Sequence, residues 1–239
     1  MRILTIGNSF SQDATRYLHG IARADGVQID VVDIVIGGCS LEQHYRNMIA
    51  DSKSYALEFN GEDTGFKTSV REALLANRYD VITVQQASHF SFDKKTYIPY
   101  AAELLGFIRQ CAPGARVLLH QTWAYEEESE RLHCVAGYDK SEHMLNDLVR
   151  AYGEVCEEVG FDGIIPSGKM LFYLAEQGIK VHRDTFHASF GLGRYALGLL
   201  WYRYLTGRTV SDNNFCDFDA SVPAAEIEIA KRYVDGIIA

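Results

Sequence analysis

Short runs of apolar residues recur along the chain, and each run is bounded by small or polar residues. The runs are rich in β-branched residues, and most are followed by a segment whose apolar positions have helical spacing. This alternation predicts parallel strands that are buried on both faces and joined by helices. The predicted strands span residues 3–6, 29–36, 81–84 and 117–119, with a weaker fifth at 163–165 that Pro166 ends.

Apolar residues spaced three and four apart predict the helices between these strands. In one of them, Val149, Tyr152 and Val155 fall on a single face. The predicted helices span residues 13–24, 68–77, 97–111, 141–159, 167–177, 189–206 and 223–237. Strands and helices that alternate, with right-handed crossovers, lead to a three-layer α/β/α sandwich around a mainly parallel, five-stranded sheet.

Two segments do not fit this alternation. Residues 52–67 have the pattern of a hairpin insertion, because Asn60-Gly61 is a strong turn signal. Residues 122–140 form a long polar loop, and loops of that length are usually functional or mobile. The sequence contains no internal repeat, low-complexity tract or linker, so we expect one domain over residues 1–239.

Composition narrows the class of protein. Apolar residues make up 47% of the chain and charged residues 23%, close to ordinary globular usage. The net charge of -9 argues against nucleic acid or an anionic membrane as a partner. The five cysteines are scattered, so we expect neither a disulfide framework nor a structural zinc site. The apolar run before Gly7 is too short for a signal-peptide core, and no stretch is long enough to span a membrane, so we expect a cytoplasmic protein.

Small and polar residues follow four of the predicted strands. The carboxyl ends of parallel strands meet at one edge of the sheet, which is where open α/β sheets bind ligands. We therefore expect these residues to converge. They are Gly7-Asn8-Ser9-Phe10-Ser11, Gly37-Gly38-Cys39-Ser40, Gln85-Gln86-Ala87-Ser88-His89 and His120-Gln121-Thr122-Trp123.

Ser9 stands between the first strand and a helix that starts within a few residues. This position would expose its hydroxyl and leave backbone N–H groups free to stabilise negative charge on a carbonyl oxygen. The alternative is that Ser9, or Ser11, merely caps the helix. A nucleophilic serine needs a base and a carboxylate that orients it, and Asp184 and His187 offer both within four residues. Taken alone, that pair could equally be a surface hydrogen bond.

The combination of these segments resembles the SGNH (GDSL-like) hydrolase superfamily. Gly7-Asn8-Ser9-Phe10 is similar to its first block, and Asp184-Thr185-Phe186-His187 is similar to its last. The longer strings ILTIGNSFSQDA, GGCSLEQH and DTFHASFGLGRYALG are similar to an uncharacterised bacterial branch of the superfamily. The resemblance runs from Arg2 to Gly207 and implies the flavodoxin-like SGNH-hydrolase fold.

Carried over position by position, the resemblance implies that Ser9 is the nucleophile, His187 the general base and Asp184 the group that orients His187. It also implies an oxyanion hole made by the N–H of Ser9 and the N–H of Gly38, with Gly37 as an alternative to Gly38.

The third block is where the chain departs from the family. The family pattern is G-x-N-D, whose Asn side chain donates to the oxyanion, whereas this chain has Gln85-Gln86-Ala87-Ser88. A Gln amide can donate the same hydrogen bond, and we favour Gln86 over Gln85 for this role. Loss of such a donor costs about 3–4 kcal/mol of transition-state stabilisation, so this position decides whether an esterase would be efficient or slow.

Other residues allow competing interpretations. His182 and His187, with His89 or His120, could bind a metal, but no H-x-x-x-H or H-E-x-x-H pair is present, and we expect neither metal nor cofactor. We instead expect His120 and Trp123 to line the substrate pocket.

Two further readings concern the loop after the second strand. Gly37-Gly38 could belong to a phosphate-binding loop, but neither glycine-rich motif for phosphate is complete. Cys39 could be a nucleophile, but the sequence shows no base for it.

The sequence thus predicts a serine esterase that hydrolyses small acyl esters, acetyl above all, with carbohydrate as one candidate alcohol. Its expected partner is a small-molecule or carbohydrate ester. The alternative is a catalytically weak or inactive relative that binds a glycan or metabolite, which the missing Asn of the third block motivates. The acyl group, the alcohol and the oligomeric state are not specified by the sequence.

Overall fold

Seven strands form one sheet in the computed structural model, which describes residues 1–237. The sheet order is β4-β3-β2-β1-β5-β6-β7. The strands are β1 (Arg2–Gly7), β2 (Asp30–Val35), β3 (Tyr55–Phe59), β4 (Glu62–Thr68), β5 (Val81–Val84), β6 (Arg116–His120) and β7 (Ile164–Ile165).

The five predicted strands make up the parallel part of this sheet. The first of them, β1, lies at the centre and pairs in parallel with β2 on one side and β5 on the other, and β6 and β7 continue the parallel run. The predicted α/β fold is confirmed, but the count of five strands is wrong. The hairpin predicted over 52–67 does not stand apart from the sheet, because β3 pairs antiparallel with β2 and brings β4 with it.

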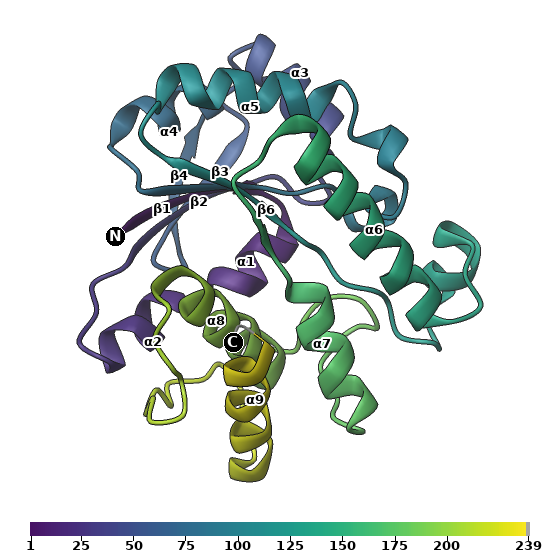
Figure 1. The fold of residues 1–239 in the computed structure, drawn as a ribbon. Coiled ribbons are helices and arrows are strands. Elements are labelled where there is room, and N and C mark those ends of the chain that lie inside the picture. The colour runs from purple at the N-terminus through teal and green to yellow at the C-terminus, as the bar shows by residue number, and fades with distance from the viewer. Residues whose placement is uncertain (238–239) are drawn as a thin grey trace.

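Helices cover both faces of the sheet. Figure 1 shows α3, α4 and α5 on one face and α1, α2, α8 and α9 on the other, while α6 and α7 flank the end of the sheet that holds β6 and β7. The helices are α1 (Ser9–Thr15), α2 (Leu18–Ala24), α3 (Leu41–Ile49), α4 (Val70–Ala76), α5 (Tyr100–Cys111), α6 (Ser141–Val159), α7 (Ser167–Glu176), α8 (Leu192–Thr206) and α9 (Ala224–Ile237). Three short turns complete the list: η1 (Ser88–Phe90), η2 (Lys94–Thr96) and the π-helix η3 (Arg131–Ala136).

The first predicted helix, 13–24, is two helices in the structure, and it begins earlier than expected. Asn8 caps α1, since its side-chain oxygen accepts the N–H of Phe10 at 3.0 Å. Ser9 is therefore the first helical residue rather than the cap, and its hydroxyl is free for another partner.

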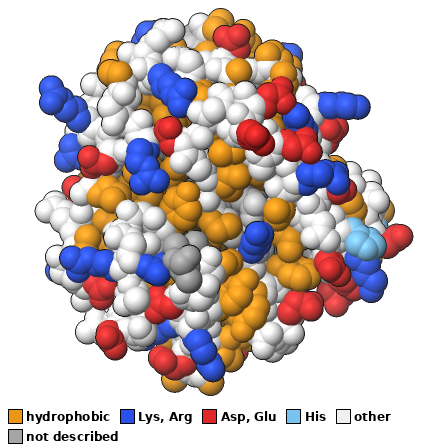
Figure 2. Space-filling view, in the orientation of Figure 1, with side chains coloured by type: hydrophobic (Ala, Val, Ile, Leu, Met, Phe, Trp, Pro, Cys, Tyr) orange, Lys and Arg blue, Asp and Glu red, His pale blue; other side chains and the backbone are white. Residues whose placement is uncertain are grey.

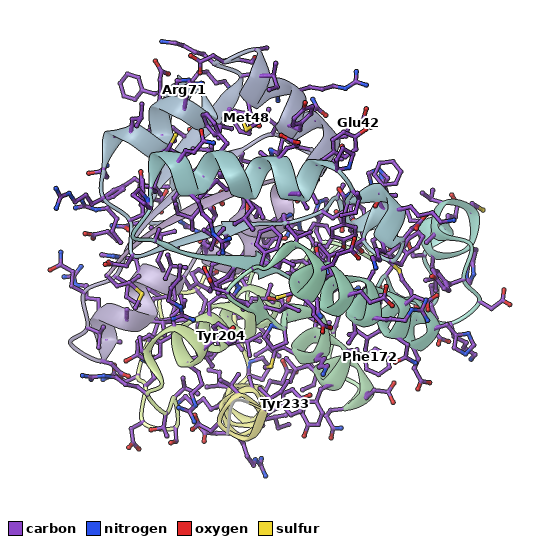
Figure 3. All side chains as sticks on the ribbon, turned by 45° about the horizontal axis from the view of Figure 1, so that its top comes forward. Glu42, Met48, Arg71, Phe172, Tyr204 and Tyr233 are labelled. Atoms are coloured by element: carbon purple, nitrogen blue, oxygen red, sulfur yellow. The ribbon has the colours of Figure 1, made fainter. Side chains whose placement is uncertain are left out.

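The helix α3 was not predicted. Its buried residues Leu41, His44 and Met48 are three and four positions apart, which is helical spacing with a histidine in the middle. Figure 3 shows Met48 turned into the helix layer and Glu42 turned towards solvent. Because the polar residue His44 occupies a buried position, the apolar pattern of this amphipathic helix is incomplete in the sequence.

The acidic excess of the chain can be viewed on one face of the molecule. Figure 2 shows basic and acidic side chains interspersed on the face that it draws. Within residues 1–237, no helix is both long enough and apolar enough to cross a membrane. The prediction of one domain over 1–239 stays a prediction, and residues 238 and 239 lie outside the described residues.

Gly7, at the end of β1, allows the sheet and α1 to approach closely. A Cβ at Gly7 would lie 2.5 Å from Ser11 Oγ and 3.2 Å from Gln85 Oε1. Gly7→Ala should therefore lower the free energy of unfolding by roughly 1–3 kcal/mol, measured by urea denaturation.

Gly106→Ala is the matched control, because a Cβ there meets nothing within 4 Å. It lies in α5 and should leave stability unchanged or raise it by up to about 1 kcal/mol. Equal effects of the two substitutions would contradict this account of Gly7.

Candidate active site

Ser9, His187 and Asp184 form a continuous hydrogen-bonded chain. Ser9 Oγ lies 2.8 Å from His187 Nε2, and His187 Nδ1 lies 2.8 Å from Asp184 Oδ2. An ionised carboxylate can only accept, so His187 Nδ1 carries the proton and Nε2 of the neutral ring accepts from the serine hydroxyl. The structure thus brings together the three residues that the resemblance assigns to catalysis.

The charge on Asp184 is favoured by its contact with His187. Partial burial by itself raises the pKa of Asp184, but hydrogen bonds from the side chain and the backbone of His187 outweigh it and lower the pKa below the usual value. The backbone N–H of His187 donates to the second carboxylate oxygen at 2.8 Å. Asp184 is therefore ionised at neutral pH and both orients the imidazole and can stabilise its protonated form.

Asp184 and His187 lie in a tight loop that we name the Asp–His turn (residues 182–188). Its two ends pair as an antiparallel bridge between His182 and Ala188, and the Arg183 N–H donates to the His187 carbonyl at 3.0 Å. At its tip Thr185 has a φ of 70°, in the left-handed region that non-glycine residues rarely adopt. Such a conformation persists only where the surroundings hold it.

The polar segment 122–140 supplies that support. Trp123 Nε1 donates to the Phe186 carbonyl at 2.7 Å, and the Glu126 N–H donates to the Thr185 carbonyl at 2.8 Å. The guanidinium of Arg131, in η3, lies over the Phe186 ring at 4.3 Å. This segment was expected to be functional or mobile, and in the structure it holds the Asp–His turn in place.

A row of side-chain hydrogen bonds crosses four neighbouring strand ends beneath Ser9. Asn8 Nδ2 donates to the Cys39 carbonyl at 3.1 Å, and Gln85 Nε2 donates to Asn8 Oδ1 at 2.6 Å. His120 Nδ1 lies 2.8 Å from Gln85 Oε1, so this nitrogen carries the proton. The expected convergence is observed. Asn8, for which the sequence pattern predicts no role of its own, is the residue that joins the strand ends.

The N–H groups of Ser9 and Gly38 are the two backbone donors that the resemblance assigns to an oxyanion hole. Gly38 has a φ of 66°, a conformation that glycine adopts without strain, and Asn8 holds the loop of Gly38 beside Ser9 through Cys39. Within residues 1–237, neither the Ser9 N–H nor the Gly38 N–H has an acceptor. Both are therefore free to stabilise negative charge.

The third donor assigned to Gln86 is not in place, which corrects the sequence-based assignment. Gln86 is buried, its Nε2 donates to the carbonyl and hydroxyl oxygens of Thr96, and its Oε1 accepts the N–H groups of Leu41 and Ala87. The less favoured Gln85 is buried too, and its amide is used by Asn8. One extra methylene lets each glutamine amide reach backbone and side-chain partners in the interior.

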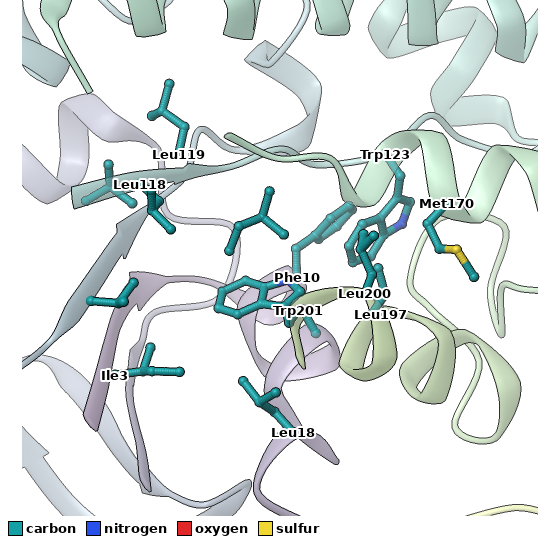
Figure 4. Packing of buried hydrophobic residues seen from close by; sticks show 14 of the residues in the cluster. Ile3, Phe10, Leu18, Leu118, Leu119, Trp123, Met170, Leu197, Leu200 and Trp201 are labelled. Atoms are coloured by element: carbon teal, nitrogen blue, oxygen red, sulfur yellow. The ribbon is translucent and has the colours of Figure 1, made fainter. Parts of the chain in front are cut away.

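His120 and Trp123 do not line a pocket, which corrects the second assignment. Both side chains are 0% exposed. Trp123 stacks on Phe10 with ring centroids 4.1 Å apart, and Figure 4 shows the two rings together in the core beside Trp201. Burial lowers the pKa of His120 to about 3, so this ring is neutral. Both side chains pack beneath the site, and Trp123 also holds the Asp–His turn through its hydrogen bond to the Phe186 carbonyl.

The structure reveals a partner for Cys39 that the sequence does not show. Cys39 Sγ lies 3.5 Å from His44 Nδ1, and the Tyr55 hydroxyl lies 2.8 Å from the same nitrogen. Burial raises the pKa of Cys39 to about 12 and lowers that of His44 to about 3. This pair is neutral and buried, so it lacks the thiolate that a nucleophile requires.

His182, one of the histidines considered as a metal ligand, has a protein partner of its own. His182 Nδ1 lies 3.2 Å from Glu126 Oε1. Among residues 1–237, no three His, Cys, Asp or Glu side chains are grouped as metal ligands would be. A cavity of about 950 Å³ is lined by Tyr125, Glu126, Phe172 and His182, among others, and none of Ser9, Asp184 and His187 lines it. It lies beside the Asp–His turn rather than at the serine.

A family model described as "Domain of unknown function (DUF4886)" matches residues 2–234. The chain belongs to the DUF4886 family. It is similar to the crystal structure of a DUF4886 family protein from Bacteroides uniformis ATCC 8492, with 31% identity, 100% of this chain and 94% of that chain covered, and a TM-score of 0.92. No curated protein matches the chain.

More distant solved structures share the fold of this DUF4886 chain. A proposed SGNH hydrolase from Slackia heliotrinireducens is 18% identical, with 86% of this chain and 98% of that chain covered and a TM-score of 0.59. The lipase/acylhydrolase from Enterococcus faecalis is 15% identical, with 87% and 97% covered and a TM-score of 0.57. The predicted resemblance to the SGNH hydrolases is thereby confirmed for the fold.

The environment of Cys39 predicts its reactivity. Iodoacetamide at pH 8 should modify the exposed Cys134 and Cys216 of the native protein and leave the buried Cys39 unmodified, because Cys39 stays a thiol. Peptide mass spectrometry after a short reaction measures this, and the urea-unfolded protein is the control in which all cysteines react. Modification of native Cys39 at the rate of Cys134 would contradict this description of the buried pair.

Proposed function

We propose that this chain is a serine esterase of the SGNH type in which Ser9 is the nucleophile, His187 the general base and Asp184 the residue that orients His187. The observation that carries the proposal is the pair of 2.8 Å contacts that join Ser9 Oγ to His187 and His187 to Asp184. Side chains 178 positions apart in sequence meet at hydrogen-bonding distance, at the strand ends where α/β sheets bind ligands.

The proposed reaction has two halves. Ser9 Oγ attacks the ester carbonyl carbon while His187 Nε2 takes the hydroxyl proton, and the ester C–O bond then breaks as His187 returns that proton to the leaving alcohol. The acyl group stays on Ser9. Water attacks the acyl-enzyme with His187 as base, the Ser9–acyl bond breaks, and the carboxylic acid leaves with the serine hydroxyl restored.

Only two backbone donors support the proposed oxyanion. The N–H groups of Ser9 and Gly38 would hold the charge, while both glutamine amides are used elsewhere. A missing donor costs about 3–4 kcal/mol, so we expect a slow esterase.

For the substrate we propose a small acyl group, acetyl above all, with a sugar as one candidate for the alcohol. The centroid of the Phe186 ring lies 4.0 Å from that of His187, and the centroid of the Phe10 ring lies 5.8 Å from it. These aromatic rings limit the room beside His187 and favour a short acyl chain.

The missing third donor also favours a second candidate, a relative that binds a glycan or metabolite without turning it over. In that case, Ser9 and His187 would serve as hydrogen-bonding groups for the ligand. An esterase assay distinguishes the two candidates.

Ser9→Ala should reduce the hydrolysis of p-nitrophenyl acetate to the rate of buffer, because the acyl-enzyme cannot form. The matched control is Ser211→Ala at an exposed position, which should keep wild-type activity. Equal activity in wild type and Ser9→Ala would contradict the esterase. No activity in either, with both correctly folded by circular dichroism, would support the binding protein.

Asp184→Asn should lower kcat on the order of 10³–10⁴-fold, because an amide stabilises the tautomer of His187 that cannot accept the serine proton. The side chain is 45% exposed, so the melting temperature should change little. A kcat within threefold of wild type would show that His187 does not depend on Asp184.

A further inference from the structure

Asp13 is a buried carboxyl group that the triad does not use. It lies on α1 four positions after Ser9, so the two side chains belong to successive turns of one helix. Its side chain is 1% exposed. Burial raises the pKa of Asp13, and the guanidinium groups of Arg194 and Arg183 counteract that rise.

The partners of Asp13 lie at both ends of the Asp–His turn. Arg183 Nη1 donates to both carboxyl oxygens at 2.9 Å, and the Ala188 N–H donates to Oδ2 at 3.1 Å. Arg183 directly precedes Asp184, and Ala188 directly follows His187. The same guanidinium also donates to the Ala188 carbonyl, so Asp13 closes the base of the turn.

These contacts are the connection between the helix of the nucleophile and the turn of the base. Within residues 1–237, every hydrogen bond between α1 and the Asp–His turn goes to Asp13, apart from the one between Ser9 and His187. A shift of the turn by about 1 Å would break the Ser9–His187 contact and would cost roughly 100-fold in rate.

We propose that Asp13 is a positioning residue that holds His187 at hydrogen-bonding distance from Ser9 by fixing both ends of the Asp–His turn to α1. This inference rests on the proposed function, since it assigns Asp13 to the geometry of that reaction. Among the hydrogen bonds of residues 1–237, none joins Asp13 to the side chain of Ser9 or His187, so Asp13 acts through Arg183 and Ala188.

The outer part of the same network offers a matched control. Arg194 Nε donates to Asp13 Oδ1 at 2.9 Å, and its Nη1 donates to Asp219 at 2.8 Å. Asp219 also binds Arg16, but among the described residues it has no hydrogen bond to the Asp–His turn. Asp219→Asn therefore removes a carboxylate from Arg194, the arginine that both aspartates share, and leaves the contacts of Asp13 with the turn in place.

The test compares Asp13→Asn with Asp219→Asn in p-nitrophenyl acetate hydrolysis and in hydrogen exchange. Asp13→Asn should lower kcat about 10- to 100-fold with KM within about twofold, because substrate binding does not use the turn geometry. Asp219→Asn should keep kcat within about threefold. Hydrogen exchange followed by mass spectrometry should show lost protection in the peptide over 182–188 for Asp13→Asn only.

Arg183→Met keeps the experiment decisive if Asp13→Asn does not fold, because it retains Asp13 with Arg194 and removes the Arg183 link to the turn, while the link through the Ala188 N–H stays. Arg183→Met should also lower kcat while KM stays within about twofold, but the fall in kcat should be smaller than for Asp13→Asn. A fall in kcat shared equally by Asp219→Asn, or unchanged exchange over 182–188 in both Asp13→Asn and Arg183→Met, would overturn the proposal.

Failure of the proposed function is recognised separately. Equal activity in wild type and Ser9→Ala would remove the esterase, and the catalytic part of this inference would fall with it. The exchange experiment needs no turnover and would still decide whether Asp13 holds the turn.

Discussion

The hydrogen bond between Ser9 and His187 is the constraint around which the molecule is organised. The two residues are separated by 178 positions and meet at 2.8 Å. This is achieved because β1 lies at the centre of the sheet, so that Ser9 emerges between the loops that follow β2 and β5. His187 is brought to this point by two segments from later in the sequence, the loop 122–140 and the Asp–His turn. The turn is bound to α1 through Asp13, and Trp123 of the loop packs in the core.

The strand ends beneath Ser9 carry buried polar groups, and buried polar groups need hydrogen-bonding partners. The row through Cys39, Asn8, Gln85 and His120 satisfies most of them. On α1, Ser11 Oγ lies within hydrogen-bonding distance of both the Asn8 carbonyl and Asp33. One hydroxyl proton cannot serve both. Burial raises the pKa of Asp33 to about 8, which favours its protonated form, and a protonated Asp33 can donate to Ser11 while Ser11 donates to Asn8.

The sequence alone predicted those strands and helices whose pattern of apolar residues is complete within the element itself. Runs of branched residues identified the five parallel strands, and the segment over 141–159 begins and ends where predicted. The helix α3 was missed because His44, a polar residue, occupies a buried position on its apolar face. Pairing of β3 with β2 was missed because a hairpin sequence indicates its turn but not its neighbour.

At the site, residue types could be predicted but not their orientations. The serine, aspartate and histidine were found because the resemblance assigns them together. Gln86 and His120 were placed at the substrate because polar residues at strand ends usually face it, yet both turn inwards to buried partners. Asp13 gave one signal, an acidic residue four positions after Ser9 on a short helix, but its partners at 183 and 188 are visible only in three dimensions.

The central claim is that His187 activates the hydroxyl of Ser9, and covalent labelling tests it most directly. An alkyl fluorophosphonate reacts with an activated serine and leaves ordinary serines unmodified. After incubation, proteolysis and peptide mass spectrometry, the account predicts one adduct, on the peptide that contains Ser9, and none when His187 is replaced by alanine. A folded protein that stays unlabelled, or an adduct on a different serine, would contradict it.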